Sequence, residues 1–118
     1  MTLFDITQLG LERAIQGAAM RQTALSQNIA NANTPGYRRR EVDFHGALRD
    51  AMERGRTDLQ GVQFSESVDG AAVMRPDGGT VDIDVESANL AKNALEYESL
   101  VSAARARIDI LKAAMGVQ

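Results

Sequence analysis

Apolar positions recur at alternating intervals of four and three residues in two stretches, one near each end of the chain. Such spacing places side chains on one face of a helix and is typical of coiled coils. The first stretch contains Phe4, Gln8, Leu11, Ile15, Ala18, Gln22, Leu25, Ile29 and Ala32. The second contains Leu90, Ala94, Tyr97, Val101, Ala104, Ile108, Leu111 and Met115. The pattern predicts two long helices that pair along these seams as an antiparallel or splayed hairpin.

Residues that favour helix ends flank both stretches. Asp5 is the predicted N-cap of the first helix, and Pro35 with Gly36 ends it, because proline disfavours a helical conformation in the residue before it. Asp84 is predicted to cap the last helix, and Gly116 to follow its last turn. These ends divide the chain into residues 1–36, 37–84 and 85–118.

The middle stretch is irregular, since residues 34–84 hold both prolines and seven of the ten glycines. Phe44, Leu48 and Met52 have the spacing of one face of a short helix. Even spacing predicts a strand over residues 62–68, and a turn at residues 77–80 completes a small β-hairpin. The predicted fold class is mainly α, with two long terminal helices pairing as a coiled-coil-like hairpin and an irregular middle segment.

The composition of the chain disfavours several classes of function. The formal charge of −3 argues against a general nucleic-acid binder, and the absence of cysteine excludes disulfides and thiolate zinc sites. Aromatic residues make up only 4% of the chain, which disfavours an enzyme built around a buried pocket. No secretory signal peptide and no direct membrane span are predicted.

No group of residues has the pattern of an active site, so neither catalysis nor a metal or cofactor is predicted. Asp82, Asp84 and Glu86 alternate but lack the calcium-loop spacing. The basic run 38–40 is expected to form a solvated loop or an intersubunit salt-bridge patch, and His45 to be exposed. No phosphate-binding glycine pattern or nucleophile elbow is present.

Several apolar residues fall outside the two seams. They are Leu9, Met20, Leu95 and Ile110. A lone hairpin leaves them in water, and so small a buried area barely offsets the entropy of ordering the chain. We therefore expect a marginally folded monomer that copies of itself or related helices complete, as a filament or tube if the contact does not close.

Two runs of residues carry a family resemblance. Residues 21–37, which include Asn-Ala-Asn-Thr-Pro-Gly-Tyr, resemble the N-terminal signature of the bacterial flagellar axial proteins of rod and hook. Residues 77–84, followed by Glu86, Leu90 and Asn93, are similar to the B-type proximal-rod branch of the flagellar basal-body rod family. Gly79-Thr80 departs from the two asparagines often found there.

The resemblance implies a structural rod subunit that assembles helically and links the membrane ring and export gate to the torque-transmitting rod. It also implies partners: other rod proteins, membrane-ring, export-gate and rod-base adaptor proteins, and copies of itself. Export through the flagellar type III apparatus, without a cleaved signal, would deliver it to the rod in the periplasmic space. The competing function is a soluble helical-hairpin adaptor or export chaperone.

Three sets of candidate residues follow. The signature turn, with Tyr37 as the expected anchor of a subunit contact, is Asn28, Asn31, Asn33, Thr34, Pro35, Gly36 and Tyr37. The helix seam is Leu11, Ile15, Ala18, Leu25, Ile29, Leu90, Ala94, Tyr97, Val101, Ala104, Ile108 and Leu111. Phe44 and Leu48 fit the spacing of the family's export-gate element; the alternative is a short helix that packs Phe44 on Leu48.

Overall fold

The computed structural model describes residues 3–70, 74 and 79–116, and within them the side chains of residues 3–5 and 56 are not described. Long helices begin and end the described chain, as the predicted mainly α class requires. The elements are α1 (Leu3–Ala30), β1 (Arg40–Glu41), α2 (Phe44–Arg54), α3 (Arg56–Gly61), β2 (Ser67–Val68) and α4 (Ile83–Ala114).

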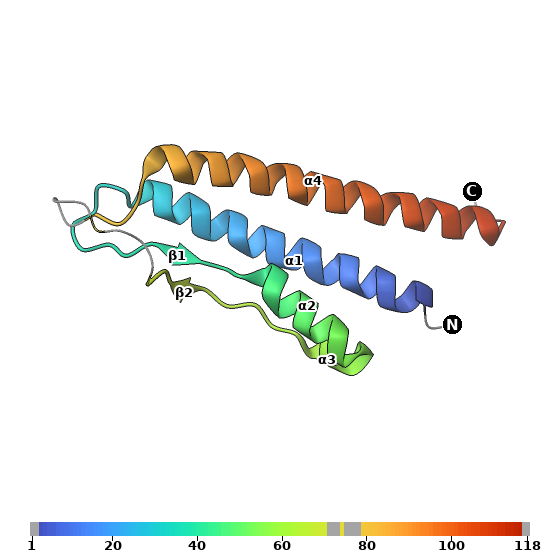
Figure 1. The fold of residues 1–118 in the computed structure, drawn as a ribbon. Helices are drawn as coiled ribbons and strands as arrows, with labels where there is room; N and C mark the ends of the chain where they lie inside the picture. The colour runs from blue at the N-terminus through green and yellow to red at the C-terminus, as the bar shows by residue number, and fades with distance from the viewer. Residues whose placement is uncertain (1–2, 71–73, 75–78, 117–118) are drawn as a thin grey trace.

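The helices α1 and α4 run side by side in opposite directions, so both ends of the chain lie at the same end of the molecule (Figure 1). The other flank of α1 is covered by α2, α3 and β1, and β2 lies on the far side of β1 (Figure 1). The molecule measures 61 × 30 × 14 Å, with a radius of gyration of 17.5 Å. A compact chain of this length has a radius of gyration of roughly 13–14 Å. The fold is therefore a thin, elongated plate.

The ends of α1 differ slightly from the prediction. The helix begins at Leu3, so Asp5 lies inside it and is not the N-cap. It ends at Ala30 and passes into turns, in which the Asn31 N–H donates to the Gln27 carbonyl at 3.0 Å. Gly36 has a φ of 77°, a left-handed conformation that glycine adopts without strain.

The predicted cap of α4 is wrong by two residues. Asp82 is the N-cap, and its Oδ1 accepts hydrogen bonds from the N–H groups of Asp84 at 3.0 Å and Val85 at 3.3 Å. Asp84 lies in the first turn instead, where its charge still opposes the helix dipole. At the other end Gly116 has a φ of 74° and follows the C-cap Met115, which confirms the predicted stop.

The middle segment contains the predicted short helix α2, whose N-cap Asp43 accepts from the Gly46 N–H at 3.1 Å. The middle segment has a small two-stranded antiparallel sheet, but its strands differ from the predicted hairpin: β1 pairs with β2 (Arg40 with Val68) across the intervening α2 and α3. The predicted strand over 62–68 is reduced to Ser67–Val68. Of the predicted turn at 77–80, residues 77 and 78 lie outside the described residues.

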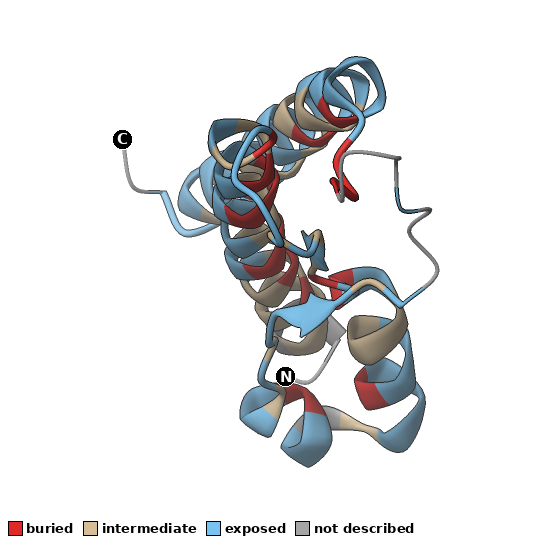
Figure 2. Ribbon diagram, turned by 90° about the vertical axis from the view of Figure 1, so that its left-hand side faces the viewer, coloured by how far each residue is buried: buried red, intermediate tan, exposed pale blue. Residues whose placement is uncertain are grey.

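The core lies where α2 and β1 meet α1. Phe44 and Val42, each 1% exposed, pack there with Ala18 and Ala24 (Figure 2). Gly17 allows this contact, because a Cβ atom at Gly17 would lie 2.5 Å from the Cβ atom of Phe44. Small residues on α1 thus let a large aromatic ring approach the helix backbone.

Candidate assembly interface and the polar cluster beside it

The predicted seam residues differ in burial along the helical pair. Ala18, Leu25 and Ala104 are buried, whereas Tyr97 and Ile108 are exposed in the single chain. The half-buried members are Leu11, Ile15, Ile29, Leu90, Ala94, Val101 and Leu111. Burial is therefore deepest in the middle of α1, and the role of the seam in an assembly stays a prediction.

Asn28, on the last turns of α1, is fully buried and forms hydrogen bonds through both amide atoms. Its Nδ2 donates to the Arg40 carbonyl at 2.8 Å and to Glu86 Oε2 at 3.3 Å. Its Oδ1 accepts from the Arg40 N–H at 3.0 Å and from the Tyr37 hydroxyl at 2.9 Å. This signature residue therefore ties α1 to the following segment and to α4 within one chain.

Arg39 forms the centre of an ion-pair cluster that sequence reasoning missed. Its Nε donates to Glu86 Oε2 at 2.7 Å, and its Nη2 donates to Glu86 Oε1 at 2.8 Å. The same guanidinium contacts Asp69 and Glu41, each at 2.9 Å. The hydrogen bonds that Arg39 donates to the Glu86 carboxylate hold the pKa of Arg39 above its ordinary value. The expected solvated loop or intersubunit patch is therefore wrong for Arg39, while Arg38 and Arg40 are exposed.

Glu86 is 1% exposed, a burial that the sequence did not lead us to expect. One signal could have identified it: Glu86 lies four residues before Leu90, in phase with the apolar seam. A carboxylate in that phase needs a cationic partner, because an unpaired buried charge is very costly.

Two further titratable groups surround Arg39. Burial alone would raise the pKa of Glu41, but hydrogen bonds from Arg21, Arg39 and the Val42 N–H hold it below its ordinary value. Burial raises the pKa of Tyr37, whose hydroxyl is bonded to Asn28. The folded chain thus favours an ionised Glu41 and a neutral Tyr37.

Thr80, at the point where the sequence departs from the family pattern, holds the segment after the signature turn. Its Oγ1 accepts from the Arg39 N–H at 2.8 Å and donates to the Tyr37 carbonyl at 3.2 Å. A single hydroxyl therefore satisfies backbone groups on both sides of Arg38.

The remaining signature residues lie at the outer end of the helical pair. Asn31 Nδ2 donates to the Gln27 carbonyl at 2.9 Å, and Thr34 Oγ1 donates to Asn31 Oδ1 at 3.1 Å. The exposed members of this turn are Asn33, Thr34, Pro35 and Gly36. Tyr37 is half-buried, and its predicted subunit contact stays a prediction.

A second buried amide, also unforeseen, lies between α1 and α4. Asn93 is fully buried, and its Nδ2 donates to the Ala18 carbonyl at 2.8 Å and to Gln22 Oε1 at 2.7 Å. Among the described residues, its Oδ1 has no hydrogen-bond partner.

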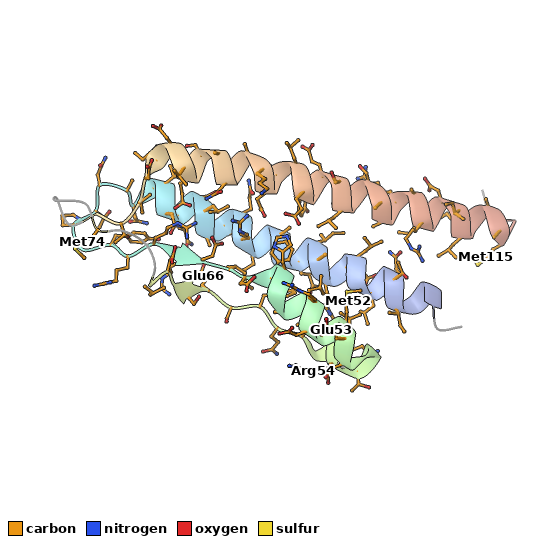
Figure 3. The ribbon with its side chains drawn as sticks, in the orientation of Figure 1. Met52, Glu53, Arg54, Glu66, Met74 and Met115 are labelled. Atoms are coloured by element: carbon orange, nitrogen blue, oxygen red, sulfur yellow. The ribbon has the colours of Figure 1, made fainter. Side chains whose placement is uncertain are left out.

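The face of α4 that points away from α1 carries several exposed apolar side chains, beside the exposed Ser99 and Ser102. Leu95 is 66% exposed and Ile110 is 63% exposed, as the sequence led us to expect for residues outside the seam. Ala103 and Ala106 lie between them on the same face, at helical spacing, and are exposed too. Met115, at the end of α4, adds a further exposed apolar side chain (Figure 3).

The candidate export element is part of the fold. Phe44 begins α2 and is buried against Gly17 and Phe64, with the two phenyl centroids 6.1 Å apart. Leu48 is half-buried one turn later. His45 is exposed, as predicted, and its Nε2 pairs with Glu96 of α4.

A known protein family matches the part of the chain that forms α1 and the signature turn. The family described as "Flagella basal body rod protein" matches residues 11–38, which cover most of α1 and the turn. The chain belongs to this family of flagellar basal body rod proteins. Of the helices in the described ranges, none combines the length and hydropathy that a bilayer span requires.

Several relatives that are similar to this chain over most of its length carry the same name. Flagellar basal body rod protein FlgB of Bacillus subtilis (strain 168) is 32% identical over 122 residues, covering 95% of each chain. FlgB of Yersinia enterocolitica is 37% identical over 106 residues, covering 75% of this chain and 77% of the relative. FlgB of Escherichia coli (strain K12) is 34% identical over 115 residues, covering 82% and 83%. These relatives confirm the predicted structural role in the proximal rod of the basal body.

Proposed function

We propose that this chain joins the base of the rod to the membrane ring and export gate, and transmits torque through helix packing. Its neighbours would be copies of itself, other rod proteins and rod-base adaptor proteins in the periplasmic space. The observation that supports this role is the exposed apolar face of α4. A plate only 14 Å thick cannot cover that face by itself, and neighbouring subunits would.

The exposed face of α4 gives a direct test. Leu95→Asp with Ile110→Asp should leave the helical circular dichroism of the isolated chain unchanged, because both side chains are already exposed. In a strain deleted for the gene, the double variant should fail to restore hooks and swimming on soft agar, since buried unpaired carboxylates are costly at a subunit contact.

The matched control adds the same charge elsewhere. Gln60→Asp with Gln63→Asp alters two exposed residues of the middle segment and should restore swimming. Full swimming with the α4 variant would remove the proposed interface. A deletion strain that still swims on complete hooks would favour the adaptor or chaperone function instead.

Export without a cleaved signal is the second part of the proposal, and Phe44 with Leu48 is its proposed recognition element. Because Phe44 is 1% exposed, the export gate could bind it only in an unfolded chain. Phe44→Ala should lower the secreted amount, whereas Val42→Ala, an equally buried core change outside the element, should not. Equal secretion of the two variants would contradict this element.

The signature turn is proposed as a subunit contact through Tyr37. Tyr37→Ala should reduce swimming because it removes the ring. Tyr37→Phe removes only the 2.9 Å hydrogen bond to Asn28 and keeps the ring. If both variants lost swimming equally, the hydrogen bond to Asn28 within the chain would account for the loss, and the ring would not be a subunit contact.

A further inference from the structure

Two polar residues of α4, Glu86 and Asn93, are buried against α1. They lie seven positions apart in the sequence. Glu86 meets Asn28, as described above, while Asn93 meets Ala18 and Gln22. The later α4 residue meets the earlier part of α1, as an antiparallel pair requires.

The apolar seam alone does not select this register. Residues seven positions apart occupy equivalent places in a coiled coil. The equivalent apolar residues of α1 are Leu11, Ala18 and Leu25, and those of α4 are Leu90, Tyr97, Ala104 and Leu111. If α4 slid by seven residues, or about 10 Å, apolar side chains would still meet apolar side chains.

The polar residues remove this equivalence. Sliding by seven in one direction moves Asn93 from Ala18 and Gln22 to Leu11 and Ile15, and in the other direction to Leu25 and Ile29. Either shift leaves a main-chain carbonyl at the place of that of Ala18 but removes the Gln22 side chain, and losing this hydrogen bond to a buried amide costs about 1–3 kcal/mol.

The same shift separates Glu86 from the group that neutralises it. Arg39 is held beside the end of α1 by Glu41 and Asp69, so it does not move with α4. A displaced Glu86 would lose the hydrogen bonds that this guanidinium donates to it. A buried carboxylate without its partner is costlier still than an unpaired amide.

We propose that Glu86 and Asn93 set the register in which α4 pairs with α1, as residues of specificity and not of net stability. The unpartnered Oδ1 of Asn93 supports this role, because its burial costs free energy that a leucine would not. A single buried amide can fix the register of a coiled coil in the same way, at the expense of stability.

The test replaces both polar contacts with apolar ones. Its four substitutions are Gln22→Leu, Asn93→Leu, Arg39→Met and Glu86→Met. The chain has no native cysteine, so cysteines at the exposed positions Glu12 and Ala88 can carry nitroxide labels without competing sites. Pulsed electron spin resonance, on labelled protein diluted with unlabelled protein, then measures the distance between α1 and α4 within one chain.

The native pairing should give one narrow distance distribution. The fourfold variant should keep its helical circular dichroism and add a second population, shifted by up to about 10 Å, the rise of seven helical residues. A control with Gln27→Leu and Ser99→Leu adds leucines at exposed positions of the same helices and should keep the single distance.

Two results would overturn the proposal. One is a single native distance in the fourfold variant, which would mean that other contacts set the register. The other is loss of helical signal in that variant, which would mean that the polar residues supply stability and not specificity.

Discussion

At one end of the paired helices, buried side chains carry charges that are stable there only when an oppositely charged side chain lies beside them. The Arg39 side chain is 12% exposed and that of Glu86 is 1% exposed, so neither is solvated in the folded chain. Breaking such a pair costs more than the pair contributes, because the remaining ion stays buried.

Glu86→Gln should therefore destabilise the chain by about 3 kcal/mol, near the lower end for broken buried pairs, since Glu41 and Asp69 still neutralise Arg39. Urea unfolding followed by circular dichroism measures the change. Glu53→Gln, an exposed carboxylate on α2, is the control and should change stability by less than about 0.5 kcal/mol. An equal change in the free energy of unfolding in the two variants would show that the Glu86 ion pair does not stabilise the chain.

Glu41 gives the expected dependence on pH. Its pKa in the folded chain lies below the ordinary value of 4.5, so its stabilising effect is present above pH 4.5 and is lost as the pH falls through the folded pKa. Unfolding at pH 7, 4.5 and 3 should show a smaller loss of stability in Glu41→Gln than in the native chain. Identical pH profiles would exclude Glu41 as a source of acid sensitivity.

At the scale of the elements, close approach decides which helices pair. The contact between α1 and α2 depends on a missing side chain at Gly17, whereas the contact between α1 and α4 combines small residues with buried amides. Helix propensity alone would favour alanine at every glycine within α1. The glycine that faces Phe44 is the exception that packing requires.

Gly17→Ala should destabilise the chain by about 1–3 kcal/mol, because the new methyl group overlaps the Phe44 ring and Cβ atom. Gly10→Ala is the matched control on the same helix. Its Cβ atom would lie 3.8 Å from the Met52 methyl group, and the higher helix propensity of alanine should stabilise the chain by up to about 1 kcal/mol. Thermal unfolding that ranked the two variants in the opposite order would contradict this packing.

At the scale of the whole molecule, stability is expected to differ between its two ends. The ion-pair cluster and Asn28 lie at the end where the signature turn meets the start of α4 (Figure 1), and Asn93 is buried further along α4, against the middle of α1. Towards the chain termini, the seam residues Ile108 and Met115 are exposed and the pair depends on a few half-buried contacts. The end of the molecule that carries the chain termini is therefore expected to be the less stable one.

Amide hydrogen exchange should follow this gradient along α4. Amides between Glu86 and Ala104 should be protected more strongly than those from Ile108 to Ala114, because opening the first region breaks buried polar contacts. Uniform protection along α4 would show that the helix opens as one unit.

The amino-acid sequence was sufficient to predict the two terminal helices, the stop at Gly116 and the short helix at Phe44. These follow from local periodicity and from backbone preferences, which act within a few residues. It also identified Leu95 and Ile110 as apolar residues that the seams do not use.

Three features could be known only from the packed chain: the pairing of Arg39 with Glu86, the amide contacts of Asn28 and Asn93, and the pairing of β1 with β2 across two helices. Each joins residues far apart in the chain, and the burial that makes a charge or an amide important arises only when the elements pack. The spacing of Glu86 puts it in phase with the apolar seam, but the cationic partner that allows its burial is brought to it by packing.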